Sequence, residues 1–439
     1  MDSNKINRSI RHLISDNIHE QYILDCLNNV EIYFGSEWIN SSERHKIQTL
    51  WKRKDELSTS ELFIIGNAIE ILKIDYDVWL KKTIGDIKKQ PDAAHGYFTE
   101  MIFASSIKAK NAKTIPAPAN KPGYDVLLES ENKKVFFSVK NHDISKHHSE
   151  FLKYSDNIRN TFKNIINRLG VSGRLVIIFN NPMSKSMYKK CILTMQLKIN
   201  GFGVFNTDDG LISIQVRPYN EYAGKPTILG SDLCIIIAPY HRNEHIGFIR
   251  KLEYAGENMK KHLKTDNNSI RMLYMRLHHT ANLEYLIKIA DRMISNDEDC
   301  GFDCVILAQP TVARDLDGYS SINTFIKFSA PRQDLSVFNV VESLGHIDFT
   351  FPLGTISQSP AKMKLINVEN GEIQTELNDA YIYQRGDIKV FAEKKDDGSY
   401  FGIASSPASG VHVIPHFNVD GQIFSLNAVK PEFENLLLI

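Results

Sequence analysis

The chain has 439 residues, a length that predicts two or three domains of ordinary size rather than one. Apolar residues make up 42% and charged residues 24%, as in ordinary globular proteins, so no disulfide framework is needed to build a core. Lys and Arg total 52 and Asp and Glu also total 52, and this zero net charge, taken alone, argues against a nucleic-acid-binding protein.

The N-terminus lacks the apolar run of a signal peptide, and no stretch approaches the 18 apolar residues of a membrane span. The five cysteines are sparse, fit reduced thiols and complete no four-ligand zinc site. We therefore expect a cytoplasmic protein that does not cross a membrane.

The charge is unevenly distributed along the chain. Residues 101–200 contain 17 basic and 6 acidic residues, a local charge of +11, whereas the remainder carries −11. Within this segment, residues 151–200 hold nine basic residues against one acidic residue. Such asymmetry marks either a binding site for a polyanion or a chance cluster of solvated lysines.

The predicted elements divide the chain into four regions. Residues 1–90 show apolar residues at helical spacing and are expected to form a helical region, with Ser58 or Ser60 as the cap of its third helix. Residues 91–220 and 221–315 alternate helices with strands. Residues 316–439 are expected to be β-rich, with Asn-Gly and Asp-Gly turns, and are acidic, with 10 basic and 17 acidic residues from position 301 onward. The acidic charge favours contacts with protein over contacts with DNA.

Residues 91–220 are expected to form one mixed sheet with helices on its faces, a restriction-endonuclease-like α/β fold. The pattern predicts a helix, a hairpin whose turn lies near Glu131 and Asn132, a second helix over 149–169 that Gly170 closes, and an apolar strand over 173–181 that is buried on both faces. A helix over 184–199 and a strand over 211–218 follow.

Two acids, a lysine and a hydroxyl are expected to converge at one end of this sheet. Asp125 opens the first strand of the hairpin, and Ser138 and Lys140 lie on one side of the second strand because side chains alternate. Glu100 lies on the preceding helix. These groups suit phosphodiester hydrolysis, since Mg²⁺ needs only one or two carboxylates and a lysine can orient the attacking water. The alternative is a cross-strand salt bridge at a sheet edge.

These residues resemble the signature of the PD-(D/E)XK nuclease superfamily, in which an acidic residue on one strand precedes an acid-x-Lys triplet on the next. Gly123-Tyr124-Asp125 resembles the first element, Ser138-Val139-Lys140 the triplet, and Glu100 the acid of the preceding helix. The resemblance covers roughly residues 91–220. It implies that Glu100 and Asp125 bind Mg²⁺, for which Mn²⁺ can substitute, and that Ser138 and Lys140 complete the catalytic set.

Ser138 departs from the family pattern, because the family usually has Glu or Asp at this position. Some members carry Ser there and recover the carboxylate from the following helix, which makes Glu150 a candidate catalytic residue. Asp143 is a nearer alternative, and Ser138 either holds a water itself or marks an inactive relic of the site.

The helix over 149–169 also carries a polar face with Asn157, Asn160, Asn164 and Arg168 at helical spacing, and Lys163 lies nearby. Amides and guanidinium groups contact phosphates, and Asn reads adenine in the major groove. We expect these residues to contact nucleic acid, the alternative being a solvated helix face.

The histidines at 142, 147 and 148 do not have the spacing of a structural zinc site, and we interpret them as polar residues of a loop and a helix start.

The residues and the resemblance together predict a magnesium-dependent DNA endonuclease in restriction or antiviral defence. A homodimer is expected because two sites are needed to cut a duplex, and a further protein subunit is a possible partner. Two alternatives remain open: a catalytically silent nucleic-acid-binding or scaffold subunit, and an RNase.

Overall fold

The computed structural model describes residues 8–41, 45–118, 123–130, 133–171, 173–218, 232–263, 268–296, 300–314, 320–330 and shorter pieces between 344 and 437. These residues form an α/β protein with mixed sheets, a helical N-terminal region and a strand-rich later part, as the sequence predicts. The chain divides into two compact units, each built from separate segments. Unit 1 comprises residues 1–143, 245–360 and 433–439, and unit 2 comprises residues 144–244 and 361–432. The predicted nuclease core, 91–220, therefore has residues in both units.

Helices dominate the first hundred residues of unit 1, where apolar side chains recur at helical spacing. They are α1 (Glu20–Phe34), α2 (Ser36–Ser41), α3 (Lys46–Lys52), α4 (Glu56–Lys89) and α5 (Ala94–Ser106), after a short 3₁₀ turn at Arg11–Leu13. The cap of α4 is neither Ser58 nor Ser60. Asp55 occupies that position, and its carboxylate accepts a hydrogen bond from the Ser58 amide, because the helix starts a few residues earlier than its apolar pattern.

A seven-stranded mixed sheet forms the centre of unit 1. In sheet order its strands are β13 (Ile356–Ser357), β11 (Ser320–Ser329), β10 (Cys304–Arg314), β9 (Ser269–Leu277), β4 (Lys134–His142), β3 (Val126–Glu129) and β2 (Lys113–Pro116). The predicted hairpin is confirmed: β3 and β4 pair antiparallel, with Val126 opposite Phe137 and Glu129 opposite Lys134. The turn residues 131 and 132 lie outside the described part of the chain. A further strand, β1 (Ile107–Ala109), pairs with β12 (Ile347–Phe349).

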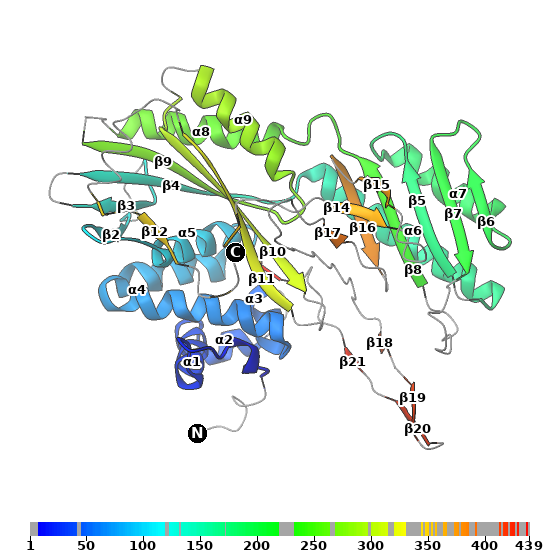
Figure 1. Cartoon of the computed structure of the whole chain (residues 1–439), viewed down its shortest axis with the longest axis horizontal. Helices are drawn as coiled ribbons and strands as arrows, with labels where there is room; N and C mark the ends of the chain where they lie inside the picture. Colours follow the sequence, from blue (N-terminus) through cyan, green and yellow to red (C-terminus); the bar gives the residue numbers. More distant parts are fainter. Residues whose placement is uncertain are drawn as a thin grey trace. The chain divides into compact units, whose positions relative to one another are not determined.

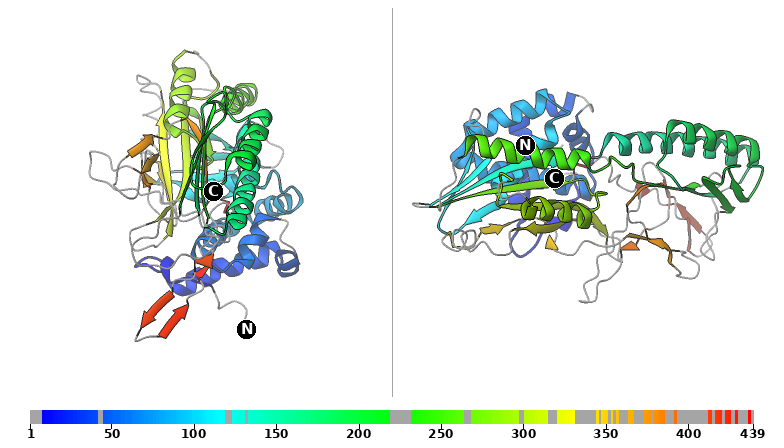
Figure 2. Two further views of the ribbon diagram at one scale, coloured as in Figure 1. Left: turned by 90° about the vertical axis from the view of Figure 1, so that its right-hand side faces the viewer. Right: turned by 90° about the horizontal axis from the view of Figure 1, so that it is seen from above.

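The strand β4 pairs parallel with β9, although 101 residues of unit 2 separate β4 from the helix α8 (Ile246–His262) that precedes β9. Parallel neighbours need a crossover connection, and α8 provides it here. In unit 1, α4 and α5 lie on one face of the sheet, and α8 and α9 (Leu283–Asn296) lie on the other (Figure 1). Figure 2 shows these elements from two further sides.

The face of β4 that packs toward α5 carries Val135, Phe137 and Val139, all of them buried in the main apolar cluster. Phe103 on α5 contacts Phe137 with a ring-centroid distance of 5.1 Å. This burial confirms the predicted alternation along β4 and leaves Ser138 and Lys140 on the opposite side of the strand.

Unit 2 contains a five-stranded sheet of its own, so the prediction of a single mixed sheet over residues 91–220 is wrong. In sheet order its strands are β16 (Ala380–Arg385), β8 (Asp232–Pro239), β5 (Gly173–Phe179), β7 (Ile212–Pro218) and β6 (Gly203–Asn206), accompanied by α6 (Lys146–Leu169) and α7 (Lys185–Lys198). The predicted helix ending at Gly170 is confirmed, with this glycine at φ 65°. The strand β5 is not buried on both faces: Leu175, Ile177 and Phe179 are buried, while Val176 and Ile178 are partly exposed.

The error about the sheet has a topological cause. Sequence order places the helix α6 and the strand β5 directly after the hairpin, but the chain leaves unit 1 after Asp143 and returns at His245. The helix and strand that complete the arrangement around the hairpin are α8 and β9, more than 100 residues later.

The later part of the chain is rich in short strands, as predicted. They are β14 (Met363–Ile366), β15 (Ile373–Glu376), β17 (Phe391–Ala392), β18 (His412–Val413), β19 (His416–Val419), β20 (Gln422–Ser425) and β21 (Ala428–Val429). The predicted Asn-Gly and Asp-Gly turns lie outside the described residues. None of the helices in the described ranges is long and apolar enough to cross a membrane.

Candidate active site

The hairpin of β3 and β4 positions three of the predicted site residues. Asp125 directly precedes β3, and its amide donates to the carbonyl of Phe137 at 2.7 Å. The register, with Val126 opposite Phe137, places Asp125 beside Ser138. Ser138 and Lys140 are two residues apart on β4 and share one side of the strand.

One carboxylate oxygen of Asp125 accepts hydrogen bonds from three groups of β4. Asp125 Oδ2 accepts from the Val139 amide at 2.6 Å, from Lys140 Nζ at 3.0 Å and from Ser138 Oγ at 3.4 Å. The ion pair with Lys140 is partly exposed, with side-chain exposures of 25% for Asp125 and 24% for Lys140. The other oxygen, Oδ1, makes no hydrogen bond to any residue that the structure describes, which leaves it available as a ligand.

Glu100, on α5, lies close enough to Asp125 and Lys140 for both charges to act on its carboxyl group. Burial and the negative charge of Asp125 raise the pKa of Glu100 to about 8, with Lys140 acting in the opposite direction. No hydrogen bond or ion pair links Glu100 to the described part of the chain. At neutral pH this raised pKa keeps most of the Glu100 carboxyl groups protonated, and a cation bound beside Glu100 would favour the ionised form.

The carboxylate oxygens of Asp125 and Glu100 suit Mg²⁺ better than a metal ion whose ligands all come from the protein. Mg²⁺ takes oxygen ligands and keeps several waters, so Asp125 and Glu100 are sufficient. Within the ranges that the structure describes, no group of three or more His, Cys, Asp or Glu side chains could hold a metal ion. Among the described residues, the candidate site thus offers a cation two carboxylates at most.

Ser138 is almost completely buried, with 1% of its surface exposed. Its hydroxyl donates to Asp125 and so helps to orient that carboxylate. Ser138 thus lies in the group, but a hydroxyl adds no negative charge to the site.

The two candidates for a displaced carboxylate belong to different units, Asp143 to unit 1 and Glu150 to unit 2. Glu150 is exposed on α6, in unit 2, where its negative charge acts on His241. Asp143 is the last residue of the first unit 1 segment. Its carboxylate accepts a hydrogen bond from Arg276 Nη1 at 2.8 Å and contacts His95 Nδ1 at 3.0 Å.

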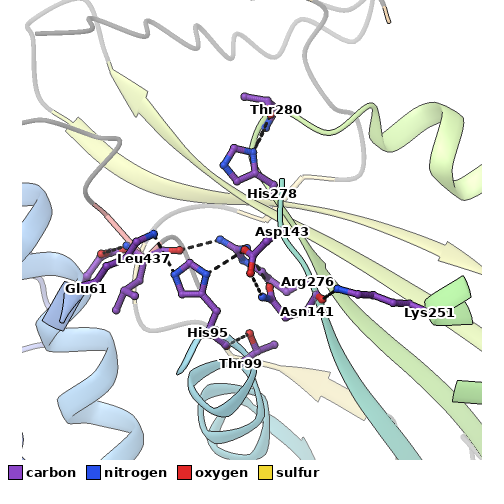
Figure 3. A network of polar contacts seen from close by, with 11 residues as sticks. Glu61, His95, Thr99, Asn141, Asp143, Lys251, Arg276, His278, Thr280 and Leu437 are labelled. Carbon is purple, nitrogen blue, oxygen red and sulfur yellow. Dashed lines mark hydrogen bonds and ion pairs between the residues drawn. The ribbon is translucent and has the colours of Figure 1, made fainter. Parts of the chain in front are cut away.

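This second polar group, which sequence reasoning missed, lies at the end of β4 (Figure 3). Arg276 on β9 is buried, with 2% exposed, and also donates to Asn141 Oδ1 at 3.0 Å. Although burial alone would raise it, hydrogen bonds from His95 and Asn141 and the charge of Arg276 hold the pKa of Asp143 well below its usual range. His95 and Asp143 lie 48 residues apart, and Asp143 and Arg276 lie 133 apart, so no local pattern could reveal the group.

The predicted nucleic-acid-binding residues lie together on α6, in unit 2. Asn157, Asn160, Asn164 and Arg168 are exposed and Lys163 is partly exposed. The opposite side of the helix carries Phe151, Ile158, Phe162 and Ile165, which are buried. The polar face is therefore accessible on its own unit.

The three histidines after Lys140 have separate structural environments. His142 packs its ring edge-on against Phe248, and burial together with the charge of Lys251 lowers its pKa to about 4. His147 stacks on His241 with ring centroids 3.6 Å apart. His148 is buried, which lowers its pKa to about 4, and its amide donates to Ser145, the cap of α6. His147 and His148 therefore lie at a helix start, as interpreted, whereas His142 ends the strand β4 and does not lie in a loop.

Comparisons with known proteins found no family model, no similar curated protein and no similar solved structure that matches this chain.

Proposed function

We propose that this protein is a magnesium-dependent DNA endonuclease. The observation that carries the proposal is the triple contact of Asp125 Oδ2 with Ser138, Val139 and Lys140, with Glu100 close enough for its pKa to respond to both charges. The elements around these residues support it further. The helix α5, which bears Glu100, precedes the antiparallel hairpin of β3 and β4. In unit 1 the helix α8 follows this hairpin, and the strand β9 then joins the same sheet parallel to β4.

Each residue has a role that its chemistry allows. A bound Mg²⁺ would polarise the phosphate and offset the negative charge that develops during attack. Asp125 Oδ1 and Glu100 would hold the cation. Lys140 Nζ, fixed by Asp125 and by the carbonyl of Val139 at 3.1 Å, would orient the attacking water and stabilise the phosphate. Ser138 would keep Asp125 in place.

The charge distribution along the chain supports a polyanionic substrate. The basic segment 101–200 contains the whole hairpin of unit 1, and within unit 2 the helix α6 carries an exposed row of amides with Arg168. We propose DNA as the substrate and, from the resemblance to PD-(D/E)XK nucleases, restriction or antiviral defence as the setting. Cutting both strands of a duplex would need two sites, which a homodimer would provide.

The test uses supercoiled plasmid DNA with Mg²⁺ and compares the wild type with Asp125→Asn and Lys140→Gln. Both variants are expected to lower the cleavage rate by at least about 100-fold, because Asp125→Asn removes a carboxylate that would hold the cation and Lys140→Gln removes the charge that would orient the water and stabilise the phosphate. Lys134→Gln is the matched control: this lysine lies on the same strand and pairs with Glu129 at 2.9 Å, outside the site. Equal cleavage by wild type and all three variants would show that the site is wrongly assigned.

The second candidate function is a catalytically silent nucleic-acid-binding or scaffold subunit. The observation in its favour is Ser138, since the described site offers two carboxylates where the family pattern has three acidic positions. A silent subunit would bind a DNA duplex equally well with EDTA and with Mg²⁺ and would cut neither plasmid DNA nor RNA. Mg²⁺-dependent cleavage of RNA alone would instead identify an RNase.

A further inference from the structure

The helix α8 places Lys251 next to the end of β4. Lys251 Nζ donates to the main-chain oxygen of Asn141, the residue after Lys140 (Figure 3). This bond uses one of the three N–H groups of the ammonium ion. No carboxylate in the described ranges lies within ion-pair distance of Lys251, which is only partly exposed.

The neighbouring cations are balanced by carboxylates, whereas Lys251 is not. Lys140 pairs with Asp125 at 3.0 Å, and Arg276 pairs with Asp143 at 2.8 Å. Burial lowers the pKa of Lys251, the charge of Asp143 acts in the opposite direction without reversing the shift, and the charges of Arg276 and Lys140 lower the pKa further. Two ion pairs and one further ammonium group therefore leave an excess positive charge beside the candidate active site.

The other polar groups that face Lys251 do not supply the missing anion. His142, two residues after Lys140, carries a lowered pKa and is neutral near pH 7. His245, at the start of α8, packs its ring against Tyr285 with centroids 4.5 Å apart. A partly desolvated ammonium group without a carboxylate partner opposes folding, so its presence favours a negatively charged ligand.

We propose that Lys251 binds a phosphate group of the substrate, next to the phosphodiester that would be cleaved at Asp125 and Lys140. The inference rests on the proposed function, because it places Lys251 at the same face of β4. Lys251 supplies two free N–H donors and one positive charge, the groups that recognise a phosphate oxygen. Lys251 is thus a substrate-binding residue from the helix that follows the unit 2 segment.

The test compares the wild type with Lys251→Gln, which keeps a donor for the Asn141 carbonyl but removes the charge. Lys260→Gln is the matched control, since Lys260 is exposed nine residues later, on the opposite side of α8. Binding of a fluorescent 20-base-pair DNA duplex is measured in Ca²⁺ at several salt concentrations, with thermal unfolding of each variant recorded in parallel. Inorganic phosphate, titrated by calorimetry, serves as a second probe.

Lys251→Gln is expected to weaken DNA binding about ten-fold and to reduce the slope of log affinity against log salt by about 1, while Lys260→Gln leaves both unchanged. The melting temperature should stay equal or rise. An unchanged affinity and slope, or a loss of affinity matched by a loss of stability, would overturn the role of Lys251 without affecting the proposed nuclease. If the wild type binds no DNA but binds phosphate through Lys251, the anion site stands and the proposed function fails; binding of neither probe overturns both.

Discussion

Glu100 carries a carboxyl group that the fold keeps largely protonated at neutral pH. Its pKa of about 8 arises from burial and from the negative charge of Asp125. A divalent cation beside it would favour the ionised form, so cation binding and proton release are coupled at this residue. Sequence reasoning identified Glu100 from its helix position but could not predict its protonation, which depends on how deeply α5 packs against the sheet.

The raised pKa of Glu100 predicts a pH-dependent stability in the absence of metal. Between pH 4.5 and about 8 the folded state holds a proton that the unfolded state has lost, so the free energy of unfolding falls as pH rises, by up to about 1.4 kcal/mol per unit. Glu100→Gln should remove this fall and stabilise the protein at pH 8. Urea unfolding in EDTA at pH 5, 6, 7 and 8 measures the effect.

The exposed Glu253 on α8 provides the control for this titration, because Glu253→Gln removes a carboxylate that water already solvates. This variant should retain the pH dependence of the wild type. If Glu100→Gln shows the same pH dependence as the wild type, Glu100 is not the group responsible.

At the scale of elements, α4 illustrates what a helix pattern shows and what packing adds. The apolar spacing predicts the helix, but not that α1 approaches it so closely that a Cβ at Gly66 would lie 2.1 Å from the carbonyl oxygen of Cys26. A second glycine of the same helix, Gly85, has no atom within 4 Å of that position. The two residues look alike in the sequence and differ only in their tertiary surroundings.

Gly66→Ala should therefore lower the free energy of unfolding by about 2 kcal/mol or more, because the main chain of α1 must move. Gly85→Ala should raise it by roughly 0.5–1 kcal/mol, since alanine favours a helix where space allows. Denaturant midpoints of both variants test this pair. Equal effects of the two substitutions would contradict the close approach of α1 and α4.

The hairpin is the element that the sequence predicted best. Alternating residues determine which side of β4 is apolar, and the register of β3 then brings Asp125 to Ser138 and Lys140. All these contacts lie within 15 residues along the chain, so local rules suffice. The apolar strand β5 was predicted less well, because composition alone does not show which faces its neighbours cover.

At the scale of the whole molecule, unit 1 includes the last described residues of the chain. Leu437 donates its amide to Glu61 Oε2 at 2.7 Å, and its carbonyl accepts from Arg276 Nη2 at 2.8 Å. Leu436 and Leu437 are both buried in the main apolar cluster. Residues near the C-terminus thus connect α4 with β9, over separations of 376 and 161 residues.

A chain that ends at Asn435 should accordingly be less stable than the full chain, by about 3 kcal/mol, because it loses two buried side chains and the partners of Glu61 and Arg276. Leu437→Ala keeps the main-chain bonds and should lose less. Thermal unfolding of the three proteins measures the difference. Equal stability of the truncated and full-length chains would show that these contacts contribute nothing.

The sequence by itself determined the α/β class, the helical beginning, the strand-rich end and the grouping of Asp125, Ser138 and Lys140, because each depends on local periodicity. Only the tertiary structure decided which sheet each strand joins, where unit 2 interrupts unit 1, and that Arg276, His95 and Lys251 gather at the end of β4. These outcomes depend on pairing and burial between residues far apart in the chain, about which local spacing carries no information.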